Sequence, residues 1–74
     1  MLLTNHEALK IWSAIKCFEF PDPNFRMVFG IERDGYEAQV RVSNNGVITV
    51  TTCSWPENEE QYYSKEHFKL AYGL

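Results

Sequence analysis

The spacing of hydrophobic positions changes between residues 20 and 25, from the period of a helix to the period of a strand. Before this point, apolar residues recur every three or four positions and fall on one helical face: Ala8, Ile11, Trp12 and Ile15. The segment Thr4-Asn5-His6-Glu7 has the pattern of a capping box, and Phe20-Pro21-Asp22-Pro23 cannot continue a helix. The pattern predicts a helix that begins at Thr4 and ends near residues 17–19.

From residue 25 onward, apolar and other residues alternate with the period of two that is typical of a strand buried on one face. The apolar positions are Phe25, Met27, Phe29 and Ile31. Asp34-Gly35 then predicts a two-residue hairpin loop of type I′. This loop places Arg33 opposite Tyr36 and Phe29 opposite Val40, so that both strands bury the same face.

Side-chain parity decides the second turn, around Asn44-Asn45-Gly46. A two-residue loop would place Ile48 and Val50 on the face opposite to Val40 and Val42, whereas a three-residue loop with a left-handed Gly46 aligns all four. We predict the three-residue loop, followed by a strand over residues 47–54 that buries Ile48, Val50 and Thr52. The other face is expected to be wet, with Arg26, Glu37, Gln39, Arg41, Thr49 and Thr51.

A second helix is predicted directly after the third strand. Ser54 and Asn58 favour an N-cap, Pro56 is tolerated in a first turn, and the nearby glutamates suit a helix N-terminus, while Gly73 would end the helix. The predicted fold is α+β, in the order α-β-β-β-α, with a three-stranded antiparallel meander and both helices packed on one face. A chain of 74 residues is long enough for one domain, over residues 1–74.

Composition narrows the class of protein. Hydrophobic residues make up 45% of the chain and include five Phe, four Tyr and two Trp, which favours a folded domain over a disordered tail. Ten acidic residues against seven basic ones give a net charge of −3, which argues against electrostatic binding to nucleic acid or to a membrane surface. No signal peptide is expected, and Cys17 and Cys53 lack paired spacing, so we expect a cytoplasmic protein.

Catalytic and metal-binding motifs do not occur in the sequence. There is no G-x-S-x-G, H-E-x-x-H or glycine-rich phosphate loop. Cys17, Cys53, His6 and His67 lack the closely spaced pairs of a structural zinc site. We therefore expect a protein that is not an enzyme and needs no cofactor or metal.

The predicted order of elements resembles that of the double-stranded RNA-binding domain. Ser64-Lys65-Glu66-His67-Phe68-Lys69 resembles the S-K-K-x-A-K pattern at the start of that family's last helix. That family binds phosphates with consecutive lysines, but Glu66 replaces the second lysine here, and the upstream glutamates would repel phosphates. The resemblance therefore implies a shared topology and not membership of the family.

Acidic residues are expected to gather at the end of the sheet that carries the Asp34-Gly35 loop. The seven residues of this acidic end are Glu7, Glu32, Asp34, Glu37, Glu57, Glu59 and Glu60. Helix N-termini would explain some of them, because acids there complement the macrodipole. They do not explain Glu32 opposite Glu37, a like-charge pair that disfavours folding. Such a field can steer a basic partner towards the protein.

The predicted second helix carries two apolar stripes. Tyr63, His67, Leu70 and Leu74 form one stripe, and Phe68 and Tyr72 point roughly the opposite way. We predict that Phe68 or Tyr72 stays exposed as an interface anchor; the alternative is that the core stripe lies between the two.

These patterns favour a non-catalytic protein–protein interaction module, an acidic inhibitor or regulator of a basic, nucleic-acid-handling protein. Anti-CRISPR proteins of phages and mobile elements are the most specific class that fits the size and charge. One alternative is an atypical nucleic-acid-binding domain of double-stranded-RNA-binding-like topology that uses the outer sheet face. Another is a small subunit of a homo-oligomer, such as a homodimer, or of a larger assembly. The predicted partner-binding residues are Glu32, Asp34, Glu37, Glu57, Glu59, Glu60, Phe68 and Tyr72.

Overall fold

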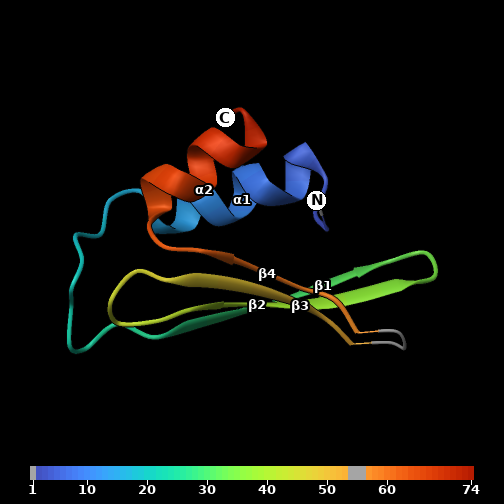
Figure 1. Ribbon diagram of the computed structural model, residues 1–74, viewed down its shortest axis with the longest axis horizontal. Helices are drawn as coiled ribbons and strands as arrows, with labels where there is room; N and C mark the ends of the chain where they lie inside the picture. Colours follow the sequence, from blue (N-terminus) through green and yellow to red (C-terminus); the bar gives the residue numbers. More distant parts are fainter. Residues whose placement is uncertain (1, 54–56) are drawn as a thin grey trace.

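Two helices cover one face of a four-stranded antiparallel sheet (Figure 1), in a computed structural model that describes residues 2–53 and 57–74. The strands lie in the order β1-β2-β3-β4, each beside the next along the chain. The elements are α1 (Asn5–Ile15), β1 (Met27–Arg33), β2 (Tyr36–Val42), β3 (Ile48–Thr52), β4 (Glu59–Tyr62) and α2 (Lys65–Tyr72). The predicted α+β class is therefore confirmed, and so is the packing of both helices on one face.

Helix α1 begins with the predicted capping box. The Glu7 amide donates to the Thr4 hydroxyl at 3.2 Å, and the Thr4 amide donates to the Glu7 carboxylate at 2.9 Å. At the other end, the Lys65 ammonium donates to the carbonyl oxygens of Lys16, at 2.8 Å, and of Phe18. Lys65 thus satisfies carbonyl oxygens at the C-cap of α1 and just beyond it.

The strand register agrees with the two turns predicted from the sequence. Phe29 lies opposite Val40 and Arg33 opposite Tyr36, as a two-residue Asp34-Gly35 loop requires. Val40 lies opposite Val50, which confirms the three-residue loop and the parity argument behind it. Gly46 adopts the left-handed conformation, with φ of 83°.

The prediction of a helix directly after the third strand is wrong. Its proposed start at Ser54-Trp55-Pro56 lies outside the described residues, and the chain from Glu59 to Tyr62 forms β4, paired with β3. Helix α2 begins later, where the Ser64 hydroxyl accepts a hydrogen bond from the His67 amide at 3.0 Å. The predicted three-stranded meander is therefore a four-stranded one, because the segment that we assigned to a helix pairs as an edge strand.

The late start of α2 also changes which of its side chains are buried. Phe68 is fully buried and Tyr72 is 2% exposed, whereas Leu70 is 81% exposed. The prediction that Phe68 or Tyr72 stays exposed is therefore wrong. Both rings contact Tyr62 of β4 edge-on or tilted, with ring centroids 5.2 and 5.7 Å away.

The core lies between the helices and the inner face of the sheet. Every element except β1 contributes buried side chains to it, as do Leu3 and Phe25, and Met27, Phe29 and Ile31 of β1 pack against it while remaining partly exposed. Burial of this apolar surface supplies most of the stabilisation. Among the described residues, the largest fully buried side chains are Ile11, Ile15, Val40, Val42, Ile48, Val50 and Phe68.

Candidate functional site

The outer face of the sheet is the side that the helices leave uncovered, and it is the candidate functional site (Figure 1). The strand register arranges its side chains in rows that cross the sheet. One row contains Val28, Arg41, Thr49 and Gln61. The next row contains Gly30, Gln39, Thr51 and Glu59, and the last contains Glu32 and Glu37. Charge therefore changes sign along the strands of this face.

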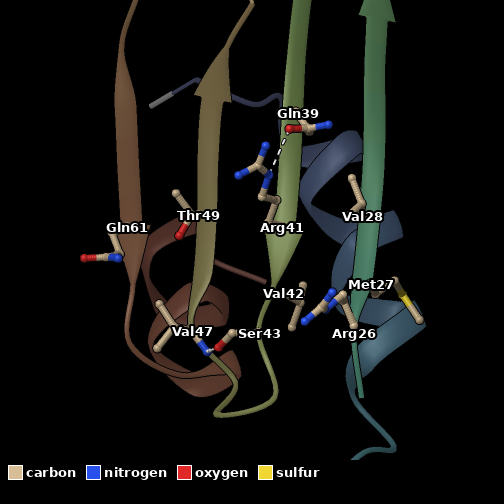
Figure 2. Close-up of a pocket in the computed structure, with 10 residues that line it drawn as sticks. All are labelled: Arg26, Met27, Val28, Gln39, Arg41, Val42, Ser43, Val47, Thr49 and Gln61. Carbon is tan, nitrogen blue, oxygen red and sulfur yellow. Dashed lines mark hydrogen bonds between the residues drawn. The ribbon is translucent and has the colours of Figure 1, made fainter. Parts of the chain in front are cut away.

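The basic end of the outer face is hollowed into an open groove of about 610 Å³ (Figure 2). Arg26 and Arg41 supply its positive charge, and Thr49 and Gln61 supply polar groups from β3 and β4. The Arg41 guanidinium donates to the Gln39 side-chain oxygen at 2.9 Å, which holds this arginine along β2. The groove can offer hydrogen-bond donors to an anionic or polar ligand.

The acidic end lies around the β1–β2 loop, as the sequence predicts. Glu32 lies directly opposite Glu37, and Glu59 of β4 lies opposite Thr51. The end of β3 and the start of β4 lie at the same end of the sheet, as Figure 1 shows. Five carboxylates at this end are exposed: Glu32, Asp34, Glu37, Glu57 and Glu59.

The two remaining acids of this end, Glu7 and Glu60, make contacts within the chain. The Glu7 carboxylate accepts from the Arg33 guanidinium at 2.9 Å, and that guanidinium stacks 3.8 Å above the centre of the Tyr36 ring. Burial alone would raise the pKa of Glu7, but hydrogen bonds from the Thr4 amide and from Arg33 hold it below its usual value. Arg33 is therefore engaged at the N-terminus of α1.

Glu60 lies on the inner face, opposite Val50, and serves as an acceptor for groups from three segments. Its carboxylate accepts from the Leu2 amide at 2.9 Å, the Tyr62 hydroxyl at 3.0 Å and the Tyr72 hydroxyl at 3.2 Å. Burial alone would raise the pKa of Glu60, but these three hydrogen bonds lower it overall. The Glu60 carboxylate is therefore engaged in hydrogen bonds within the chain, whereas its predicted role is to bind a partner.

Helix macrodipoles do not explain the exposed glutamates after β3. We expected Glu57, Glu59 and Glu60 to face the N-terminus of the second helix. However, β4 carries the chain away from the acidic end before α2 begins, beside the C-terminus of α1 where Lys65 binds. Glu57 and Glu59 thus lie at the end of the sheet without a helix N-terminus of their own.

Other kinds of site are not found in the part of the chain that the structure describes. Within residues 2–53 and 57–74, no three His, Cys, Asp or Glu side chains lie close enough together to hold a metal ion. No helix in these residues has the length and apolar character needed to cross a bilayer. Both cysteines are free and exposed.

Comparison of the chain with protein-family models, with curated proteins and with solved structures gives no significant match. The geometry of the outer face is therefore the basis of the functional argument.

The structure thus brings five of the eight predicted partner-binding residues together at one exposed end. Glu60 turns inward, and Phe68 and Tyr72 belong to the core on the other side of the sheet. Sequence reasoning did not include Gln61, which β4 adds to the outer face beside Thr49. The sequence carries little signal for this strand, because Tyr62 is the one apolar residue among Glu59, Glu60, Gln61 and Tyr62.

Proposed function

We propose that the chain is a non-catalytic protein-binding module whose acidic end recognises a basic partner. The observation that carries this proposal is the exposed pair of Glu32 and Glu37 in directly opposite positions. Like charges in such positions destabilise a sheet. The arginines of the outer face lie towards the other end and line the groove there. A protein is expected to retain such a destabilising pair where its negative electrostatic field contributes to binding a partner.

The partner that fits this surface is a protein that handles nucleic acid, and the module would act as its inhibitor or regulator. Such proteins bind phosphates with Lys and Arg side chains, so an array of carboxylates can occupy the same surface. A phage-encoded inhibitor of the anti-CRISPR kind is the most specific form of this proposal. The net charge of −3 and the two free, exposed thiols support an acidic protein of a reducing cytoplasm.

Quantitative affinity capture tests the acidic end. The immobilised chain is exposed to nuclease-treated cell lysate, and bound proteins are quantified by mass spectrometry. The test variant is Glu37→Gln with Glu59→Gln, and the matched control is Glu19→Gln with Glu66→Gln, two exposed acids outside the acidic end that give the same change in net charge. We expect basic proteins that bind the wild type and the control but not the test variant. Equal capture by all three proteins would contradict the proposal.

A second candidate function is nucleic-acid binding at the basic end of the outer face. The groove beside Arg26 and Arg41 favours it, because it combines two guanidinium groups with the polar side chains of Thr49 and Gln61. Retention on heparin that is lost in Arg26→Gln with Arg41→Gln would support this function. Elution of the wild type without retention at low salt would exclude it.

A further inference from the structure

Strand β1 forms an open edge of the sheet with few of the features that usually protect an edge. It is seven residues long, contains neither proline nor lysine, and pairs with β2 continuously, without a bulge. The opposite edge, β4, has only four residues, and three of them are Glu or Gln. The longer and more apolar edge is therefore the one that is open to another strand.

The hydrogen bonds of the sheet show which backbone groups β1 offers. The Ser43 amide donates to Val47 and the Cys53 amide donates to Glu37, so the odd-numbered residues of β2 direct their backbone groups to β3. The even-numbered residues of β2 then bond their partners in β1, which are Met27, Phe29, Ile31 and Arg33. The amides and carbonyls of Val28, Gly30 and Glu32 consequently point to the open edge.

Apolar side chains on the inner side of this edge are also incompletely covered. An open groove of about 300 Å³ lies between α1 and β1 and is lined in part by Ile11, Phe29 and Ile31. Met27, Phe29 and Ile31 are each only partly buried in the isolated chain. A strand added beside β1 would cover these three side chains and satisfy its outward backbone groups at the same time.

We propose that this strand is β1 of a second copy of the chain, so that two sheets join into one of eight strands. Antiparallel pairing about a two-fold axis at Phe29 places Arg26 opposite Glu32 of the second copy, and the same pair recurs across the axis. On the inner face, Met27 lies opposite Ile31 of the second copy, and the two Phe29 rings face each other. Backbone hydrogen bonds join Val28 to Gly30 of the second copy, in both directions.

Complementary charge favours a second copy as the occupant, and charge together with the apolar inner face selects this register. A shift must be by two residues to keep the inner faces on the same side. A shift that pairs the two copies of Gly30 places Met27 opposite Arg33, and a shift the other way places Arg26 opposite Gly30. Only the register centred on Phe29 combines the two Arg26–Glu32 pairs with a fully apolar inner face.

Sedimentation velocity and amide hydrogen exchange on the purified chain test this dimer without any other partner. We expect the mass to rise from 8.7 kDa towards twice that value as the concentration approaches about 1 mM. Over the same range, the amides of Val28, Gly30 and Glu32 should gain protection, whereas those of Phe29 and Ile31 should be protected throughout. A monomer at every concentration, or protection that does not change, would overturn the proposal.

A charge swap tests the register. Arg26→Glu and Glu32→Arg each create two like-charge contacts across the dimer interface. Each should lower the association constant of the dimer about tenfold at low salt. The double variant restores both pairs and should return the constant to within about threefold of the wild type. Arg41→Glu is the matched control, because it makes the same charge change on the same face but on β2, and it should have little effect. A dimer that is insensitive to both single changes, or a double variant that is as weak as they are, would overturn the assigned register.

Discussion

Glu60 shows how one residue can have a role that its charge alone would not indicate. The sequence places it among six other acids at one end of the sheet, but its carboxylate is turned towards the core. There it accepts hydrogen bonds from the Leu2 amide and from the hydroxyls of Tyr62 and Tyr72. Burial raises the pKa of both tyrosines, so both hydroxyls keep their protons as donors. Glu60 thereby ties the N-terminal segment to β4 and α2.

We expect Glu60→Gln to lower the free energy of unfolding at pH 7 by about 1–3 kcal/mol, because an amide oxygen replaces a charged acceptor. Urea denaturation gives the value. The control is Glu59→Gln, the exposed neighbour on the outer face, which should change stability by less than about 0.5 kcal/mol. Equal stability of the two variants would show that the Glu60 hydrogen bonds contribute nothing net.

The acid dependence of stability follows from the lowered pKa of Glu60. In the folded chain, the pKa of Glu60 lies below its usual value of 4.5, so the carboxylate stays charged at pH values where it would be protonated in the unfolded chain. Its contribution to the stability of the fold is therefore complete above pH 4.5 and is lost as the pH falls through the folded pKa. We expect the wild type to lose more stability than Glu60→Gln when the pH is lowered from about 6 to about 3. Parallel losses in the two proteins, measured by urea denaturation at each pH, would contradict this assignment.

At the scale of elements, the loop between β2 and β3 fixes which side chains face the core. Gly46 has φ of 83°, and a β-carbon at this position would lie 2.8 Å from Cγ of Phe20. Gly35 also has positive φ, of 70°, but open space lies where its β-carbon would be. Substitutions at Gly35 and Gly46 therefore distinguish the effect of backbone strain from the effect of steric overlap with a neighbouring side chain.

We expect Gly46→Ala to destabilise the chain by about 2–4 kcal/mol, from backbone strain together with displacement of Phe20. Gly35→Ala should cost only the backbone strain, about 1–2 kcal/mol. Thermal and urea denaturation of the two variants provide the comparison. A smaller loss for Gly46→Ala than for Gly35→Ala would contradict the packing of Phe20 against this turn.

The rotation of α2 gives a second prediction at this scale. Phe68→Ala removes a fully buried ring and should lower the free energy of unfolding by about 3–5 kcal/mol. Leu70→Ala, two positions further on, removes a side chain that is 81% exposed and should change it by less than about 0.5 kcal/mol. The reverse order of effects would mean that Leu70, and not Phe68, faces the sheet.

The parts of the fold that could be predicted are those where a local pattern has one physical solution. The capping box at Thr4, the Asp34-Gly35 loop and the parity across Gly46 each leave a single register or start point. Strand β4 could not be predicted in this way, because four residues with one apolar side chain carry too little periodicity. Its pairing depends on β3 beside it and on a core that Tyr62 completes.

For the candidate site, too, the sequence predicts the residues of the β1–β2 hairpin but not those of β4 and α2. Glu32, Asp34 and Glu37 were placed correctly because the hairpin register was correct. The inward direction of Glu60 and the burial of Phe68 and Tyr72 depend on β4 and on the start of α2 at Ser64. An N-cap serine followed by helix-forming residues occurs at Ser64 as well as at Ser54. Only pairing with β3 decides between them.

At the scale of the whole molecule, the two faces of the sheet differ: the inner face packs against the helices, and the outer face is exposed to solvent. The helices and the inner sheet face contain the core, while the uncovered face carries arginines at one end and glutamates at the other. In the proposed dimer, each Glu32 would meet an arginine of the second copy, and Glu37 and Glu59 would remain available to another protein. In the dimer, partner binding would therefore rest on Glu37 and Glu59, because Glu32 takes part in self-association.

The rate of association with the captured partner, measured by stopped flow as a function of salt, tests the role of the acidic end most directly. Screening shortens the Debye length from about 10 Å at 0.1 M salt to about 3 Å at 1 M. We expect wild-type association to slow steeply over this range, and the Glu37→Gln, Glu59→Gln variant to start slower and respond less. The same salt dependence in both proteins, with the variant folded, would show that these glutamates do not steer the partner.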